Sequence, residues 1–82
     1  MNANVSGTFE IDCNKASCKK IIQAGRQNGA YGFIVDKQSK QDPDVIMNVS
    51  GKTQTQVWSL INEVIEPLGG KVRVKIGNSL LY

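Results

Sequence analysis

The 82-residue sequence contains no histidine, and this absence limits the chemistry that it can support. Histidine is the commonest general base near neutral pH and the commonest zinc ligand. Without it, Ser-His-Asp catalysis, Cys-His catalysis and every metal site that uses an imidazole are excluded. The sequence also lacks long hydrophobic runs, because stretches such as Phe33–Val35 are far shorter than the roughly 20 residues of a membrane span.

The first residues show no pattern of a targeting signal, and the sequence has only two cysteines. Residues Met1–Asn4 lack the basic and apolar regions of a signal peptide, so we expect a cytoplasmic protein with no membrane contact. The only cysteines, Cys13 and Cys18, are expected to stay reduced in that compartment. With 40% hydrophobic and 21% charged residues, the chain should fold as one domain over residues 1–82. The net charge of +3 is too small to indicate an anionic partner.

The pattern of apolar residues predicts the element order β-α-β-β-α-β. Strands are expected at residues 5–12, 30–35, 45–49 and 71–76, with Gly51 ending the third. One amphipathic helix should run from Asn14 to Asn28-Gly29, with Gly25 permitting close packing on the sheet. A second should begin at Thr53 and end near Pro67, with a wide apolar stripe that includes Trp58. This order predicts an α+β fold, the ferredoxin-like βαββαβ plait, with a four-stranded antiparallel sheet in the order 4-1-3-2 and two helices on one face.

The face of the sheet without helices is expected to be polar. If Phe9 and Ile11 face the helices, the first and fourth strands place opposite charges on the other face, from Thr8, Glu10, Asp12, Lys71, Arg73 and Lys75. Such pairs contribute about 0.2–1 kcal/mol each. The face is then either a solvated surface with ion pairs or a polar docking surface for a protein.

Nucleic-acid binding is an alternative that this face does not favour. Plaits that bind RNA stack bases on aromatic residues of the central strands. Here the corresponding positions hold Thr8, Glu10 and Ile46 or Asn48. Acidic residues in the middle of the face would also repel phosphate.

The turn from the first strand into the first helix carries Lys15, Ser17 and Lys19, which are candidates for contact with an anion at a helix N-terminus. The competing interpretation is that Asn14 and Ser17 cap the helix and that the lysines are solvated. Cys13 and Cys18 also lie here, and their placement resembles that of plaits of the heavy-metal-associated family. That resemblance implies soft-metal binding, although four residues separate these cysteines and the family has two. Cys18 also falls on the apolar stripe, as a buried structural thiol would.

The second half of the chain resembles acylphosphatases, which share the plait topology. The resemblance rests on Gly32–Asp36, the polar loop after it, the strand 45–51 and the helix that carries Trp58. It supports the fold and argues against the activity. Asp36 stands where the family has asparagine, and Ile11–Lys15 has neither the glycines nor the arginine of the family's phosphate loop. An acylphosphatase-like hydrolase would have to use Asp36 and Lys15.

We therefore expect a small non-catalytic protein-interaction module without a cofactor, such as a regulator or inhibitor of a larger protein, encoded by a virus or by its host. Its contact surface is expected to comprise the second strand and the C-terminal tail, with Tyr31, Phe33, Leu80, Leu81 and Tyr82. An exposed edge strand adds to a partner's sheet or pairs with itself, so the chain would be a monomer or a homodimer. The alternatives are a nucleic-acid-binding plait, an acylphosphatase-like hydrolase and soft-metal binding through Cys13 and Cys18.

Overall fold

The computed structural model describes residues 4–73, which form an α+β fold. In chain order the elements are β1 (Asn4–Asp12), α1 (Lys15–Gln27), β2 (Tyr31–Ile34), β3 (Val45–Thr53), α2 (Gln54–Ser59) and β4 (Lys71–Arg73). A π-helical turn (Leu60–Ile65) and a 3-10 turn (Glu66–Leu68) extend α2. The expected α+β class is confirmed. Lys75, Leu80, Leu81 and Tyr82 lie outside the described residues.

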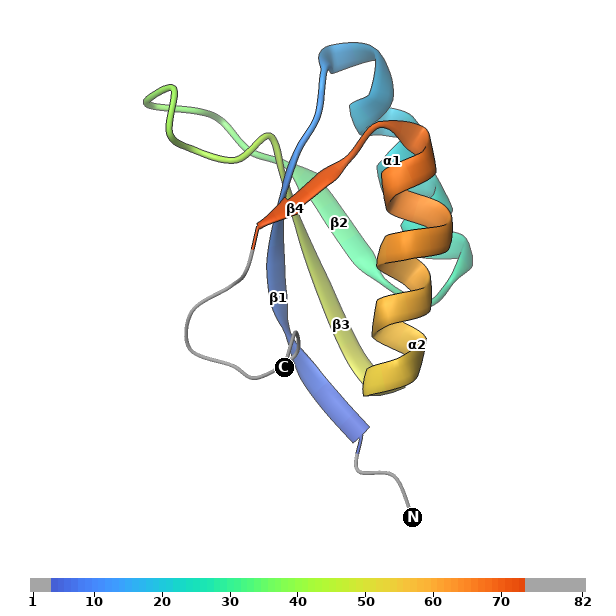
Figure 1. The fold of residues 1–82 in the computed structure, drawn as a ribbon. Helices are drawn as coiled ribbons and strands as arrows, with labels where there is room; N and C mark the ends of the chain where they lie inside the picture. The colour runs from blue at the N-terminus through green and yellow to red at the C-terminus, as the bar shows by residue number, and fades with distance from the viewer. Residues whose placement is uncertain (1–3, 74–82) are drawn as a thin grey trace.

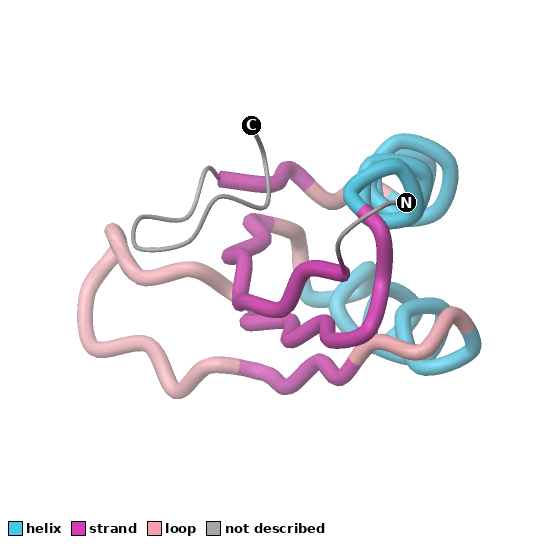
Figure 2. The backbone as a smooth tube through the Cα atoms, turned by 90° about the horizontal axis from the view of Figure 1, so that it is seen from below, coloured by secondary structure: helices cyan, strands magenta, loops and turns pink. Residues whose placement is uncertain are grey.

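The four strands form one antiparallel sheet in the order β2-β3-β1-β4. Both helices lie on the same face of this sheet, and the opposite face carries no helix in the described part of the chain (Figures 1 and 2). β1 and β3 are central, and β2 and β4 are the edges. This arrangement is compatible with the expected plait. No helix within residues 4–73 is long and apolar enough to cross a membrane.

Helix α1 begins and ends where the sequence predicts. The side chain of Asn14 caps it by accepting a 2.9 Å hydrogen bond from the Ser17 amide. Asn28 is the C-cap, and Gly29 follows with a φ of +80°, a conformation that favours glycine. Gly25 is buried, and a Cβ there would lie 2.6 Å from Met47 Cε, so this glycine does permit close packing on β3.

The second helix begins with a capping box at Thr53, whose hydroxyl accepts a hydrogen bond from the Gln56 amide while the Gln56 side chain accepts one from the Thr53 amide. Its later turns depart from α geometry. Pro67 has no N–H to donate, and its ring crowds the carbonyl four residues earlier. Trp58 was expected in the buried stripe but is 38% exposed. The inward positions follow Val57 at intervals of four, and Trp58 lies about 100° to one side of Val57.

The sequence predicted that Gly51 ends the third strand, and this prediction is wrong. β3 continues to Thr53, and the pairing with β1 shifts between Val5 and Gly7. Gly51 lies on β3 opposite this shift and has a φ of +70°, as in a β-bulge that needs a residue without a Cβ. The glycine therefore bends the strand and leaves the pairing to resume at Lys52.

The core lies between the sheet and the two helices. Phe9 and Ile11 of β1 are fully buried there, as the alternating pattern predicts. The largest fully buried side chains are those of Phe9, Ile11, Ile21, Met47, Ile65, Val45 and Val57. Among the described residues no polar or charged residue is buried, so the charged groups all lie at the surface.

Candidate functional site

The open face of the sheet is organised in rows of paired residues. One row runs from Phe33 on β2 through Ile46 and Glu10 to Arg73 on β4. The next joins Tyr31, Asn48 and Thr8, and the Thr8 hydroxyl donates a 2.7 Å hydrogen bond to the Asn48 side chain. The β2 side of this face is thus aromatic and the β4 side is charged.

Strand β2 gathers exposed apolar side chains. Tyr31 is 72% exposed, Phe33 50% and Ile34 56%. Tyr31 and Phe33 were predicted as contact residues, and the structure brings them together on the open face. The sequence analysis did not single out Ile34. It pairs with the buried Val45 and so lies on the covered face, and the sequence does not show how far α1 extends over that edge. Neither helix covers this end of the sheet enough to bury Ile34.

The predicted charge pairing between β1 and β4 is confirmed for Arg73. Its guanidinium donates two hydrogen bonds of 2.7 Å to the Asp12 carboxylate and a third of 2.7 Å to the backbone oxygen of Gln41. The hydrogen bond to Asp12 is the main cause of a raised Arg73 pKa. These hydrogen bonds connect β4 to the 35–44 loop and leave the guanidinium fewer donors for an external anion.

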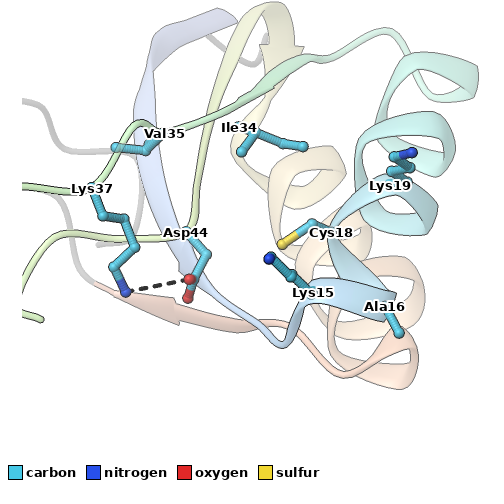
Figure 3. Close-up of a pocket in the computed structure, with 8 residues that line it drawn as sticks. All are labelled: Lys15, Ala16, Cys18, Lys19, Ile34, Val35, Lys37 and Asp44. Atoms are coloured by element: carbon cyan, nitrogen blue, oxygen red, sulfur yellow. Dashed lines mark hydrogen bonds and ion pairs between the residues drawn. The ribbon is translucent and has the colours of Figure 1, made fainter.

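A pocket of about 590 Å³ opens beside the N-terminal half of α1 (Figure 3). Its walls come from α1, the end of β2 and the loop that follows, and it is lined by Lys15, Ala16, Cys18, Lys19, Ile34, Val35, Lys37 and Asp44. Lys15 and Lys19 thus share one pocket, as their candidate role in anion contact requires. Ser17 is not part of it: its amide is capped by Asn14, and its hydroxyl lies near Gly69.

The two cysteines meet at the base of α1. Their sulfur atoms lie 2.9 Å apart, and both thiols are free. Cys18 is buried, as expected of a structural thiol, and Cys13 is half-buried. Burial raises the pKa of Cys13 to about 12, followed by the hydrogen bond to Cys18, the charge of Cys18 and the nearby carboxylates of Asp44 and Asp12. Within residues 4–73 no third cysteine or carboxylate completes a cluster that could hold a metal ion.

Asp44, which the sequence did not single out, ties three segments together. Its carboxylate accepts a 3.0 Å hydrogen bond from the Cys13 amide and pairs with the Lys37 ammonium at 3.3 Å. Its backbone donates to the Ile11 carbonyl and accepts from the Val35 amide. The Cys13 amide, and then Lys37, hold the pKa of Asp44 below its usual value. Asp44 therefore fixes the cysteine turn against the pocket.

Replacing Asp44 should loosen this turn in a pH-dependent way. Because the pKa of Asp44 is lowered by folding, its stabilising effect is present at neutral pH and is lost as the pH falls through its folded-state pKa, below 3.8. Asp44→Ala should cost about 1 kcal/mol of unfolding free energy at neutral pH and flatten the acid limb of the stability curve. Urea denaturation followed by circular dichroism at several pH values tests this. Asp36→Ala, at an exposed position in the same loop, is the control, and equal losses in both variants would contradict the assignment.

Comparison of the chain with protein-family models, with curated proteins and with solved structures gave no match.

Proposed function

We propose that this chain is a small, non-catalytic protein-interaction module of the ferredoxin-like βαββαβ class, and that it binds an extended segment of a partner protein along β2. One observation carries the proposal. Four large apolar side chains are exposed within the described residues, and three of them, Tyr31, Phe33 and Ile34, belong to the four-residue strand β2. Exposed apolar residues scattered singly are normal, whereas a cluster on one element marks a contact site.

The two edges of the sheet differ in a way that supports this choice. Natural proteins protect edge strands with lysine, proline, bulges or charged side chains that point inward. The short strand β4 carries Lys71 and Arg73, and Arg73 is ion-paired to its neighbour. Residues Tyr31–Ile34 contain no charge and no proline. β2 is thus the edge at which a further strand meets no electrostatic barrier.

The chemistry of the partner follows from the same strand. An added strand gains main-chain hydrogen bonds from the edge and specificity from side chains on alternate faces. Tyr31 and Phe33 offer aromatic surface on the open face, and Ile34 offers an aliphatic contact beside the pocket. The partner segment should therefore be extended and carry apolar side chains on both of its faces. The free thiols of Cys13 and Cys18 suit a reducing compartment, so we place the module in the cytoplasm.

The test is partner capture with charge variants of β2. Phe33→Lys and Ile34→Lys put a cation on the edge without altering the core, and Trp58→Lys makes the same change at an exposed apolar residue on α2. Proteins retained by the wild-type chain are identified, purified and titrated against each variant by calorimetry. A large apolar side chain buried at the centre of an interface contributes about 2 kcal/mol, so each β2 variant should bind about 30-fold more weakly, and the α2 variant should bind as tightly as the wild type.

Sedimentation and melting curves complete this test. If β2 pairs with a second copy instead, the wild-type chain sediments as a dimer and Phe33→Lys as a monomer, and the partner is the chain itself. Unchanged melting temperatures show that the variants remain folded. A partner that binds Phe33→Lys and Ile34→Lys as tightly as the wild type would overturn the proposal.

A further inference from the structure

We infer that Cys13 and Cys18 form a dithiol–disulfide site whose reactant is a small anionic disulfide admitted by the lysine-lined pocket. This inference does not rest on the proposed function: Ile34 borders both sites, but the reaction takes place at the base of α1 and requires no partner strand on β2. It begins from the distance between the two sulfur atoms, which is 2.9 Å in the reduced protein.

That distance is close to what an internal disulfide needs. The sulfur atoms of a disulfide are about 2.05 Å apart, so they must approach by less than about 1 Å. Cys13 lies in the turn after β1, and Cys18 lies in the first turns of α1, with its sulfur toward the pocket (Figure 3). The Asn14 cap and the hydrogen bond from the Cys13 amide to Asp44 hold both ends of this turn. The pair is therefore positioned for bond formation before any oxidant arrives.

The donor groups among the described residues disfavour a shared metal ion, which the cysteines had suggested as an alternative. Two thiolates bound tetrahedrally at about 2.3 Å from one metal would lie roughly 3.8 Å apart. The observed separation of 2.9 Å is shorter, and no third ligand from the described residues joins the pair. Two sulfurs in direct contact match the geometry of a dithiol that closes on itself.

The pocket determines which disulfides reach the sulfur of Cys18. Its lining includes the apolar side chains of Ala16, Ile34 and Val35. Three lysines, Lys15, Lys19 and Lys37, line it, against the single carboxylate of Asp44, which is already paired with Lys37. A site with this excess of cations attracts a disulfide that carries carboxylates and repels one that carries amines.

The reaction is a pair of thiol–disulfide exchanges. The Cys18 thiolate attacks one sulfur of the external disulfide, and a mixed disulfide forms as the first external thiol leaves. Cys13 then loses its proton and attacks the Cys18 sulfur, so that the Cys13–Cys18 bond forms and the second external thiol leaves. The protein loses two protons and two electrons, which together are two hydrogen atoms, and the external disulfide gains them as it becomes two thiols. With the Cys18 thiol consumed in the first step, its hydrogen bond and its charge no longer oppose ionisation of Cys13.

The test treats the whole chain with oxidised glutathione, an anionic disulfide, and follows its mass. The wild type should become lighter by two hydrogen atoms and should not accumulate a glutathione adduct. Cys13→Ser should retain glutathione on Cys18, because the resolving thiol is gone. Trypsin distinguishes the two cysteines, since Lys15 lies between them. A wild-type chain that keeps both thiols, or that accumulates a stable adduct, would overturn the inference.

The role of the pocket has its own control. The double variant Lys15→Gln, Lys19→Gln should react about tenfold more slowly with oxidised glutathione and no more slowly with cystamine, a cationic disulfide. Both lysines are exposed, so their loss should leave the fold intact, as circular dichroism can verify. Equal slowing with both disulfides would show that charge selection at the pocket is wrong.

Discussion

Alkylation of Cys13 by iodoacetamide should accelerate steadily from neutral pH to about pH 11, without the plateau that an ordinary cysteine shows above its pKa of about 8.5. The thiolate is the reacting species, and its fraction rises about tenfold per pH unit below the pKa. Burial is the largest cause of the raised pKa of Cys13, and the hydrogen bond to Cys18 is the second. Timed alkylation followed by tryptic mass mapping measures Cys13 separately from Cys18, because they fall on different peptides.

Removing Cys18 should make Cys13 more reactive at neutral pH, not less. Cys18→Ala deletes the hydrogen bond and the charge that raise the Cys13 pKa and leaves burial, Asp44 and Asp12 in place. The lysines of the adjoining pocket, Lys15, Lys19 and Lys37, are unchanged in this variant. If one pKa unit is recovered, alkylation near neutral pH speeds up about tenfold. A wild-type profile that levels off near pH 9, or a Cys18→Ala variant no faster than the wild type, would contradict the contact between the two sulfurs.

The parts of the fold that local patterns determine could be predicted from the sequence. Asn14 and Thr53 are capping residues whose side chains must satisfy amides at a helix start, and both do so in the structure. The alternation around Phe9 and Ile11 assigns the buried face of β1, because successive side chains on a strand point to opposite faces. Arg73 could likewise be placed on the open face, but its choice of Asp12 over Glu10 as the ion-pair partner depends on the diagonal geometry between strands.

The parts that depend on the extent of neighbouring elements were not predictable. Ile34 has the alternation of a core residue, and only the position of α1 relative to the sheet edge leaves it 56% exposed. Trp58 belongs to a wide apolar stripe. Because the helix is rotated so that Val57 points into the core, Trp58 lies beside the buried face and is partly exposed. Gly51 looked like a strand end because glycine weakens strands, but here its positive φ serves a bulge. In each case the local sequence is compatible with two structures, a buried or an exposed side chain for Ile34 and Trp58 and a strand end or a bulge for Gly51. Contacts between distant parts of the chain determine which one forms.

Met47→Ala should be among the most destabilising single changes in the molecule. Met47 is fully buried on the central strand β3. Its methyl group packs against the backbones of Gly25 and Gly32. A Cβ built on Gly25 would lie 2.6 Å from the Met47 Cε atom, and one built on Gly32 would lie 3.0 Å from it. Truncation to alanine leaves a cavity next to both glycines and should lower the free energy of unfolding by about 2–5 kcal/mol. A domain of this length is expected to have a free energy of unfolding of roughly 4–12 kcal/mol, so the loss is a large share of it. Met47→Leu, which conserves volume, should cost less than about 1.5 kcal/mol in the same urea titration.

Gly25→Ala should destabilise the wild-type chain but stabilise the Met47→Ala variant. In the wild type the new methyl group meets the end of the Met47 side chain, which is fully buried between Gly25 and Gly32. Overpacking toward the upper end of about 1–3 kcal/mol should therefore exceed the helix-propensity gain of about 1 kcal/mol. In the Met47→Ala background the same methyl group enters the cavity, and the propensity gain remains, so Gly25→Ala should stabilise the chain by about 1 kcal/mol or more. The four proteins form a double-mutant cycle with a coupling of about 2 kcal/mol. Losses that add to within about 0.5 kcal/mol would mean that α1 and β3 do not share this contact, and that Gly25 serves some purpose other than close packing on the sheet.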